Sequence, residues 1–412
     1  MSKNVKKFVN RTFMRTADLG LLERLLSPYA DELDLDLDGL PEDGRERREV
    51  LFEFFRGADE SFPSQLLDAL HCILVLATAN GTRILREQAD GAGVELVPAE
   101  EVGGENDGRH LTPRDIALRA YLDHRALFDQ ALDLLAFAEP PSPMEIVGLR
   151  EGVEPRHEEE EARQAFRSSA SAYFSERYLG RYCDIRWYTD DGEIDILVLH
   201  GKNMVTQLVE QNGEERVLTY REIQQDTVRY DPQSGRLKVS AQYAPEKRKL
   251  ASLFAEHLLG EPDFFDGGDS QNLYTLRPVN EAGAGFSFRT EWDTELRRLA
   301  IREIQVDEGE RIVDGRTRHP RWSTTVRDNR NAIARLMEIA PDLDMAGLRI
   351  NYLKAEFTFT LDDKPRHITV KVKPPSVVSF RRDAFEARIM EHLRRNGLCI
   401  PRRPDTAAAA AE

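Results

Sequence analysis

Cysteine is scarce in this chain of 412 residues. The three cysteines, Cys72, Cys183 and Cys399, are far apart and odd in number. A secreted protein stabilised by disulfides needs a framework of paired cysteines, so the sequence predicts a reducing, cytoplasmic compartment. Long hydrophobic runs are also missing. The longest, from Leu70 to Ala79, is interrupted by His71 and is too short to span a bilayer, so we expect no membrane role.

The common catalytic signatures are absent too. The chain contains no Gly-x-Ser-x-Gly, His-Glu-x-x-His or Cys-x-x-Cys, which argues against the usual hydrolase, zinc-protease and zinc-ribbon chemistries. The acidic stretch Asp34–Gly39 matches the first positions of a calcium loop, but Arg45 occupies the twelfth, where a bidentate Glu is needed. We therefore predict neither a metal nor a cofactor, and a binding protein is favoured over an enzyme.

Charge is unevenly distributed. The net charge is −16, yet residues 311–404 contain 20 Lys and Arg against 11 Asp and Glu. A basic segment in an acidic chain indicates a polyanionic ligand or an acidic partner surface. Docking of this segment on the acidic body of the same chain would give the same pattern, and so would a plain solvated surface. These alternatives stay open from the sequence alone.

Residues 1–153 are expected to form a helical domain. Thr16-Ala-Asp18 precedes a stripe of leucines at 21, 22, 25 and 26, which is the spacing of a helix that faces a core. Residues 64–88 predict one further helix, with Gly81 as an interruption. Thr112-Pro-Arg-Asp115 combines a capping Thr, a Pro at the first position and an acid in the first turn, so it predicts another helix start.

Residues 154–310 are expected to form a helix followed by an antiparallel meander. A helix through Phe166 and Phe174 precedes short β-branched and aromatic runs between residues 183 and 243. The runs are separated by Asp-Gly, His200-Gly201, Asn-Gly and Asp231-Pro-x-x-Gly, all of which suit tight turns. We also expect strands at 273–276 and 295–306.

Residues 311–404 are expected to form a basic helix–hairpin–helix module, and residues 405–412 a disordered tail. Residues 326–339 predict a helix, 348–373 a hairpin, and 383–396 a final helix. Phe385, Ile389 and Leu393 lie four residues apart and should pack against the hairpin. The predicted fold class is thus α+β, with a helical N-terminal region, a central meander and this basic module.

One stretch suggests an enzymatic alternative. A helix with Glu161, then a strand, then Gly192-Glu-Ile-Asp195, resembles the front half of the PD-(D/E)xK nuclease fold over about 50 residues. The resemblance implies Asp195 as a metal ligand and Glu161 as an accessory acid. The second signature, Glu-x-Lys, is missing, because Glu210 has no Lys two residues on. Otherwise Asp195 is a polar residue on the exposed face of an alternating strand.

The leading hypothesis is a non-enzymatic binding or adaptor component of a bacterial-type multi-protein assembly. Its basic module would contact DNA, RNA or a protein partner, since guanidinium and ammonium groups bind phosphates and carboxylates. A degenerate metal-dependent nuclease and a structural or regulatory homo-oligomer are the alternatives. The candidate binding residues are Arg316, Arg318, Arg321, Trp322, Lys371, Lys373, Arg381, Arg382, Arg394 and Arg395.

Overall fold

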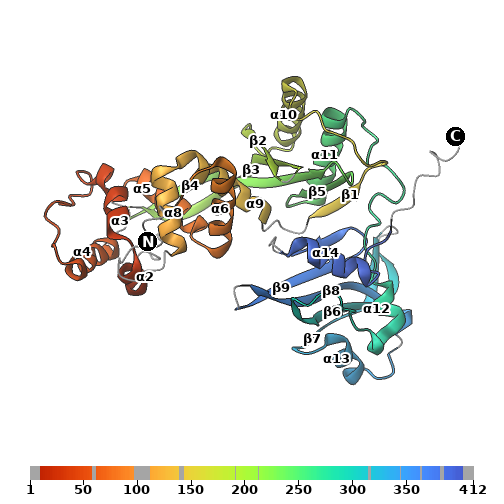
Figure 1. Cartoon of the computed structure of the whole chain (residues 1–412). Coiled ribbons are helices and arrows are strands. Elements are labelled where there is room, and N and C mark those ends of the chain that lie inside the picture. Colours follow the sequence, from red (N-terminus) through yellow and green to blue (C-terminus); the bar gives the residue numbers. More distant parts are fainter. Residues whose placement is uncertain are drawn as a thin grey trace. The chain divides into compact units, whose positions relative to one another are not determined.

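The computed structural model describes residues 10–57, 62–96, 112–138, 143–190, 192–211, 213–313, 317–343, 345–361, 364–380 and 385–401. The chain divides into two compact units. The first comprises residues 1–138 with 206–219, and the second comprises residues 139–205 with 220–412. Helices and two antiparallel five-stranded sheets make up the described chain, which confirms the α+β class (Figure 1).

The first unit is mainly helical. Its described helices are α2 (Arg11–Thr16), α3 (Leu19–Leu26), α4 (Gly44–Gly57), α5 (Ser64–Leu76), α6 (Ala79–Ala92), α8 (Pro113–Asp123) and α9 (Arg125–Ala138). Asp18 caps α3, whose four leucines are buried as predicted. The single helix predicted over 64–88 is instead two helices, because Thr78 caps α6 by accepting a hydrogen bond from the Gly81 amide at 3.0 Å.

The first sheet of the second unit has the strand order β1-β5-β4-β3-β2. The strands are β1 (Met144–Val147), β2 (Cys183–Asp190), β3 (Glu193–Gln211), β4 (Glu214–Asp231) and β5 (Arg236–Ser240). Helices α10 (Glu160–Glu176) and α11 (Ala244–Leu253) cover one face of it (Figure 1). Residues 144–147, which we expected within the helical region, therefore form an edge strand paired with β5.

The meander has fewer and longer strands than the sequence predicted. His200-Gly201 was expected to be a turn, but β3 runs through it without interruption. Gly201 does not adopt a positive φ. The position requires glycine for another reason, because a Cβ there would lie 2.2 Å from the Leu179 carbonyl oxygen. The glycine thus permits a close backbone approach rather than a turn.

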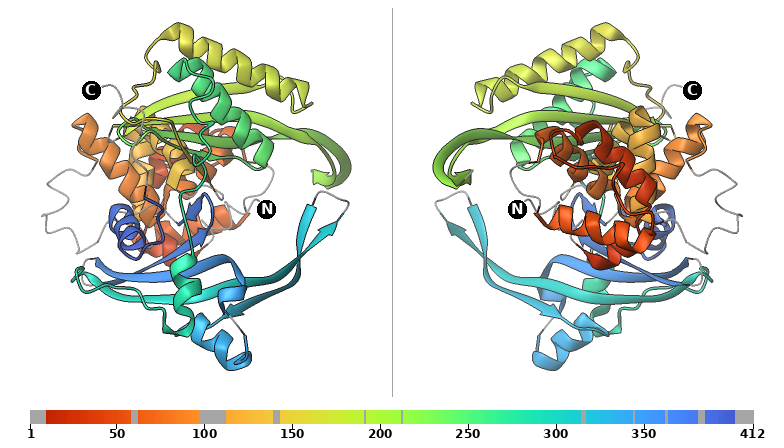
Figure 2. Two further views of the ribbon diagram at one scale, coloured as in Figure 1. Left: turned by 90° about the vertical axis from the view of Figure 1, so that its right-hand side faces the viewer. Right: turned by 90° about the vertical axis from the view of Figure 1, so that its left-hand side faces the viewer.

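The second sheet has the order β10-β9-β8-β6-β7. Its strands are β6 (Leu296–Val313), β7 (Thr317–Arg327), β8 (Arg349–Leu361), β9 (Lys364–Lys373) and β10 (Val377–Ser379). Helices α12 (Arg277–Ala282), α13 (Ala332–Ile339) and α14 (Glu386–Arg395) pack on its core. β6 and β7 continue to pair beyond the last β6–β8 pair, and their hairpin extends past the rest of the sheet (Figure 2).

The basic module is part of this larger sheet. The predicted hairpin is β8–β9, and Phe385, Ile389 and Leu393 are buried in its core as expected. The Phe385 ring stacks on Phe359 at 4.3 Å. However, the sheet also takes β6 from before residue 311. It also includes β7, whose last two residues, 326 and 327, were expected to begin the helix predicted over 326–339. The strand expected at 273–276 is only an isolated bridge between Tyr274 and Cys399.

Candidate functional site

The predicted pair Lys371 and Lys373 lies on β9, on the face of the second sheet opposite its core. Alternate residues of a strand face opposite sides, and Val370 and Val372 are buried in the core. Lys371 pairs in register with Lys354 of β8. We call Lys354, Lys371 and Lys373 the lysine cluster.

The lysine cluster has few acidic partners. Neither Lys371 nor Lys373 makes an ion pair with a residue that the structure describes. The Lys371 ammonium lies 4.5 Å from the Tyr352 ring centre. Its pKa is lowered by burial and then by repulsion from Lys373 and Lys354, with Glu303 acting in the opposite direction. Like charges are therefore held together here at a cost in free energy.

Glu303 is the acid at the edge of this cluster and is already shared. It is 5% exposed, and it accepts hydrogen bonds from Tyr352 Oη at 2.6 Å and Arg327 Nε at 2.5 Å. The Lys354 ammonium lies 2.9 Å from it. Burial acts to raise the pKa of Glu303, but these three donors lower it to about 2. One carboxylate thus serves three donors, and two lysines remain without an acid of their own.

The pH dependence of folding should report on Glu303. Its pKa is below that of an exposed Glu, so its contribution to stability is present above pH 4.5 and is lost as the pH falls towards 2. Between pH 6 and pH 2.5, the wild-type chain should lose about 1–3 kcal/mol more free energy of unfolding than Glu303→Gln. Urea titrations at both pH values measure this. The exposed control Glu291→Gln should behave as wild type, and equal losses in all three chains would contradict the assignment.

Among the residues that the structure describes, no contact joins the other candidate cations to the lysine cluster. Arg316, Arg381 and Arg382 lie outside the described residues, as does the predicted disordered tail. Arg318 and Arg321 are residues of strand β7. Trp322 on the same strand is 40% exposed. Arg394 and Arg395 of α14 both pair with Glu391, one turn before them.

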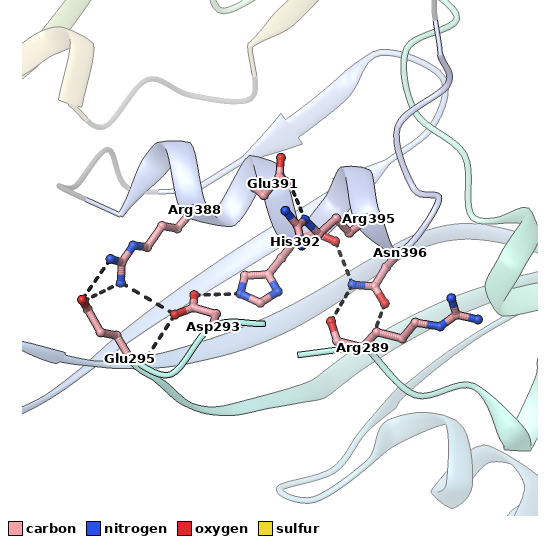
Figure 3. A network of polar contacts seen from close by, with 8 residues as sticks. All are labelled: Arg289, Asp293, Glu295, Arg388, Glu391, His392, Arg395 and Asn396. Atoms are coloured by element: carbon pink, nitrogen blue, oxygen red, sulfur yellow. Dashed lines mark hydrogen bonds and ion pairs between the residues drawn. The ribbon is translucent and has the colours of Figure 1, made fainter. Parts of the chain in front are cut away.

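Helix α14 is fixed by a polar network along its length (Figure 3). His392 is fully buried, and its Nε2 lies 3.0 Å from the Asp293 carboxylate. Arg388 pairs with Glu295, and Asn396 binds the backbone of Arg289. The pKa of Asp293 is lowered overall. Burial acts to raise it, but the hydrogen bond from His392 and weaker contacts outweigh burial. The network positions the helix, so part of the basic charge is neutralised within the chain.

The first sheet holds Asp195 in a buried ion pair. The side chain is 0% exposed, and both of its oxygens accept hydrogen bonds from the guanidinium of Arg229, which is 8% exposed. The exposed-face interpretation of Asp195 is therefore wrong. Glu161 is exposed in the first turn of α10, and Glu210 binds the Gly213 amide at the hairpin tip. Within the described ranges, no group of three or more His, Cys, Asp or Glu could hold a metal.

Asp195 belongs to a row of charges that the sequence analysis missed. Strand register places Glu145 of β1 beside Lys238 of β5, and Lys238 beside Arg229 of β4. Helix α14 adds Glu386, 3.1 Å from the Lys238 ammonium. The signal was present in the sequence, because neighbouring strands carry charges at alternating positions. We interpreted that alternation as an exposed face, whereas other parts of the second unit cover it.

These sites differ in what they offer to a ligand. In the charge row, the ion pairs are made within the chain, whereas the lysine cluster keeps two cations on an open sheet face.

In the described part of the chain, no helix has the length and apolar character needed to cross a membrane. Neither a known protein family nor a curated protein sequence matches the chain.

Proposed function

We propose that the chain is a non-enzymatic binding component of a larger assembly that contacts nucleic acid through the lysine cluster. The supporting observation is the set of three lysines on two neighbouring strands around one shared carboxylate. Repulsion among them raises the free energy of the unliganded protein. A phosphate group placed between Lys371 and Lys373 would relieve that repulsion, so an anion is the ligand that this face favours.

The contacts proposed here are to the phosphate backbone rather than to bases. The Tyr352 ring is half-buried, and two ammonium groups lie near its centre, Lys371 at 4.5 Å and Lys354 at 5.7 Å. That ring is committed to cation–π contacts within the chain, so it is not a free platform for base stacking. Nearby amides are paired with each other, as in the Asn351 Nδ2–Gln305 Oε1 hydrogen bond of 2.6 Å. Binding should therefore depend little on base sequence.

The charge of the surrounding segment supports the same ligand. Residues 311–404 carry 20 Lys and Arg against 11 Asp and Glu. A polyanion held at the lysine cluster would experience this long-range potential as well as the local contacts. Arg394, with a side chain 72% exposed, pairs with Glu391 only at the surface, where ion pairs are weak and easily exchanged for another anion.

Removing the two lysines tests the proposal. Lys371→Ala/Lys373→Ala should weaken binding of fluorescein-labelled 20-nucleotide DNA and RNA at least about tenfold at 50 mM salt, for every sequence tested. Fluorescence anisotropy of the full chain measures this. Arg248→Ala/Lys249→Ala removes the same charge from α11 and should bind as wild type.

Two results would overturn the proposal. One is equal loss of affinity in the lysine and the control variants, because binding would then follow net charge alone. The other is no binding of either nucleic acid by the wild-type chain at 50 mM salt. In that case an acidic surface of a protein partner would be the ligand that the same lysines favour.

A further inference from the structure

A polar cavity of about 300 Å³ lies in the second unit, between the first sheet and helix α14. Three strands, β3, β4 and β5, and α14 contribute its walls. All but one of the lining side chains are charged or polar, and the exception is Met390 of α14. Ligand pockets in proteins begin at about this size, so any occupant is a small molecule.

Most of these charges are neutralised by contacts within the chain. Arg229 is held by Asp195, and the Lys238 ammonium lies 3.1 Å from Glu386. Asp231 accepts hydrogen bonds from the Gln233 amide at 2.9 Å and the Ser234 hydroxyl at 2.5 Å, which fixes the turn between β4 and β5. These groups shape the cavity, but their binding capacity is used.

Arg236 keeps capacity for an anion. Its nearest carboxylate is Glu145, with Nη1 3.7 Å from the closer oxygen, which is too long for a hydrogen bond. Its Nε is buried and has no hydrogen-bond partner among the described residues. A buried donor without an acceptor costs free energy, and a carboxylate oxygen of a ligand would remove that cost.

Glu193 carries the opposite charge and also lines the cavity. Its carboxylate lies 3.3 Å from Arg229 Nε, a group that Asp195 already holds. Burial raises the pKa of Glu193 to about 6, against the attraction of Arg229 and Lys238. A cationic group in the cavity would stabilise the ionised form.

We propose that this cavity binds a small zwitterion of the α-amino-acid class, with its carboxylate at Arg236 and its ammonium at Glu193. Strands β5 and β3 are two strands apart, about 9–10 Å, and Arg236 and Glu193 both line the cavity from them. An α-amino acid carries its two charges within that span. Met390 supplies an adaptable apolar contact for the side chain of the ligand.

Isothermal titration calorimetry of the full chain tests this inference without nucleic acid, so its result is independent of the proposed function. The ligands are the twenty common amino acids one by one, with acetate as the anion alone and methylammonium as the cation alone. We expect at least one amino acid to bind, and neither single-charge compound to compete with it. Arg236→Gln and Glu193→Gln should each weaken binding about tenfold or more, because each removes one charged hydrogen bond.

Controls separate loss of the ligand from loss of the fold. Arg297→Gln and Glu291→Gln make the same changes at exposed positions and should bind as wild type. Met390→Trp should abolish binding by filling the cavity while leaving the thermal unfolding temperature without ligand within a few degrees. The inference is wrong if no amino acid binds the wild-type chain. It is also wrong if binding survives in Arg236→Gln and Met390→Trp, or if acetate alone displaces the bound amino acid.

Discussion

Replacing Asp195 by alanine should lower the free energy of unfolding by about 3–5 kcal/mol. The substitution leaves the guanidinium of Arg229, which is 8% exposed, in the interior without the carboxylate that binds two of its nitrogens. Glu193 is 3.3 Å away and half-buried, so it compensates only in part. Urea titration monitored by tryptophan fluorescence measures this difference in the free energy of unfolding.

Two comparisons show whether the ion pair is the cause. Replacing both partners, Asp195→Leu with Arg229→Met, should restore most of the lost stability, because no uncompensated buried charge remains. Glu161→Ala removes an exposed carboxylate and should change stability by less than about 0.5 kcal/mol. We also expect Asp195→Ala to leave the result of a magnesium-dependent DNA cleavage assay unchanged. A loss of such cleavage would support the nuclease alternative, and a destabilisation below about 1 kcal/mol would contradict the buried pair.

Leu393→Ala should destabilise the second unit by about 2–5 kcal/mol. The side chain is fully buried in the core between α14 and the second sheet, together with Ile389 and Phe385. Truncation leaves a cavity that the flanking network at His392 and Arg388 restrains from collapsing. Urea unfolding of the full chain measures the loss.

The matched control is a residue of α13, another helix that packs on the second sheet. Ile339 is 61% exposed at the end of α13, so Ile339→Ala should change the free energy of unfolding by less than about 0.5 kcal/mol. Similar losses for both variants would mean that α14 does not bury the stripe that its sequence predicts. A loss below about 1 kcal/mol for Leu393→Ala would have the same meaning.

The sequence predicted features that depend on local signals. The caps at Asp18 and Thr112 were predicted correctly, because a capping side chain and its partner amide are three residues apart. The buried stripe of α14 and the shared face of Lys371 and Lys373 follow from the periods of a helix and a strand. Each of these is decided within one element.

What the sequence did not predict depends on contacts between distant elements. The strand pattern around Asp195 indicated two faces but not that both are covered. Glu145, in a stretch we expected to be helical, receives a 2.6 Å hydrogen bond from Tyr274, 129 residues away. Glu303 meets Lys354 and Arg327 only through the pairing of β6 with two other strands, next to a bulge at residue 302. No local pattern encodes such a neighbour.

The salt dependence of nucleic-acid binding shows whether Lys371 and Lys373 contact phosphates. Anisotropy titrations of the wild-type chain and of Lys371→Ala/Lys373→Ala, from 50 to 200 mM salt, give the slope of log affinity against log salt concentration. If both lysines neutralise phosphates, the slope of the variant should be shallower by about 1.4 on single strands or about 1.8 on duplex, at 0.7 and 0.9 per phosphate. Equal slopes for both chains, or no binding at 50 mM, would mean that these two lysines do not bind nucleic-acid phosphates.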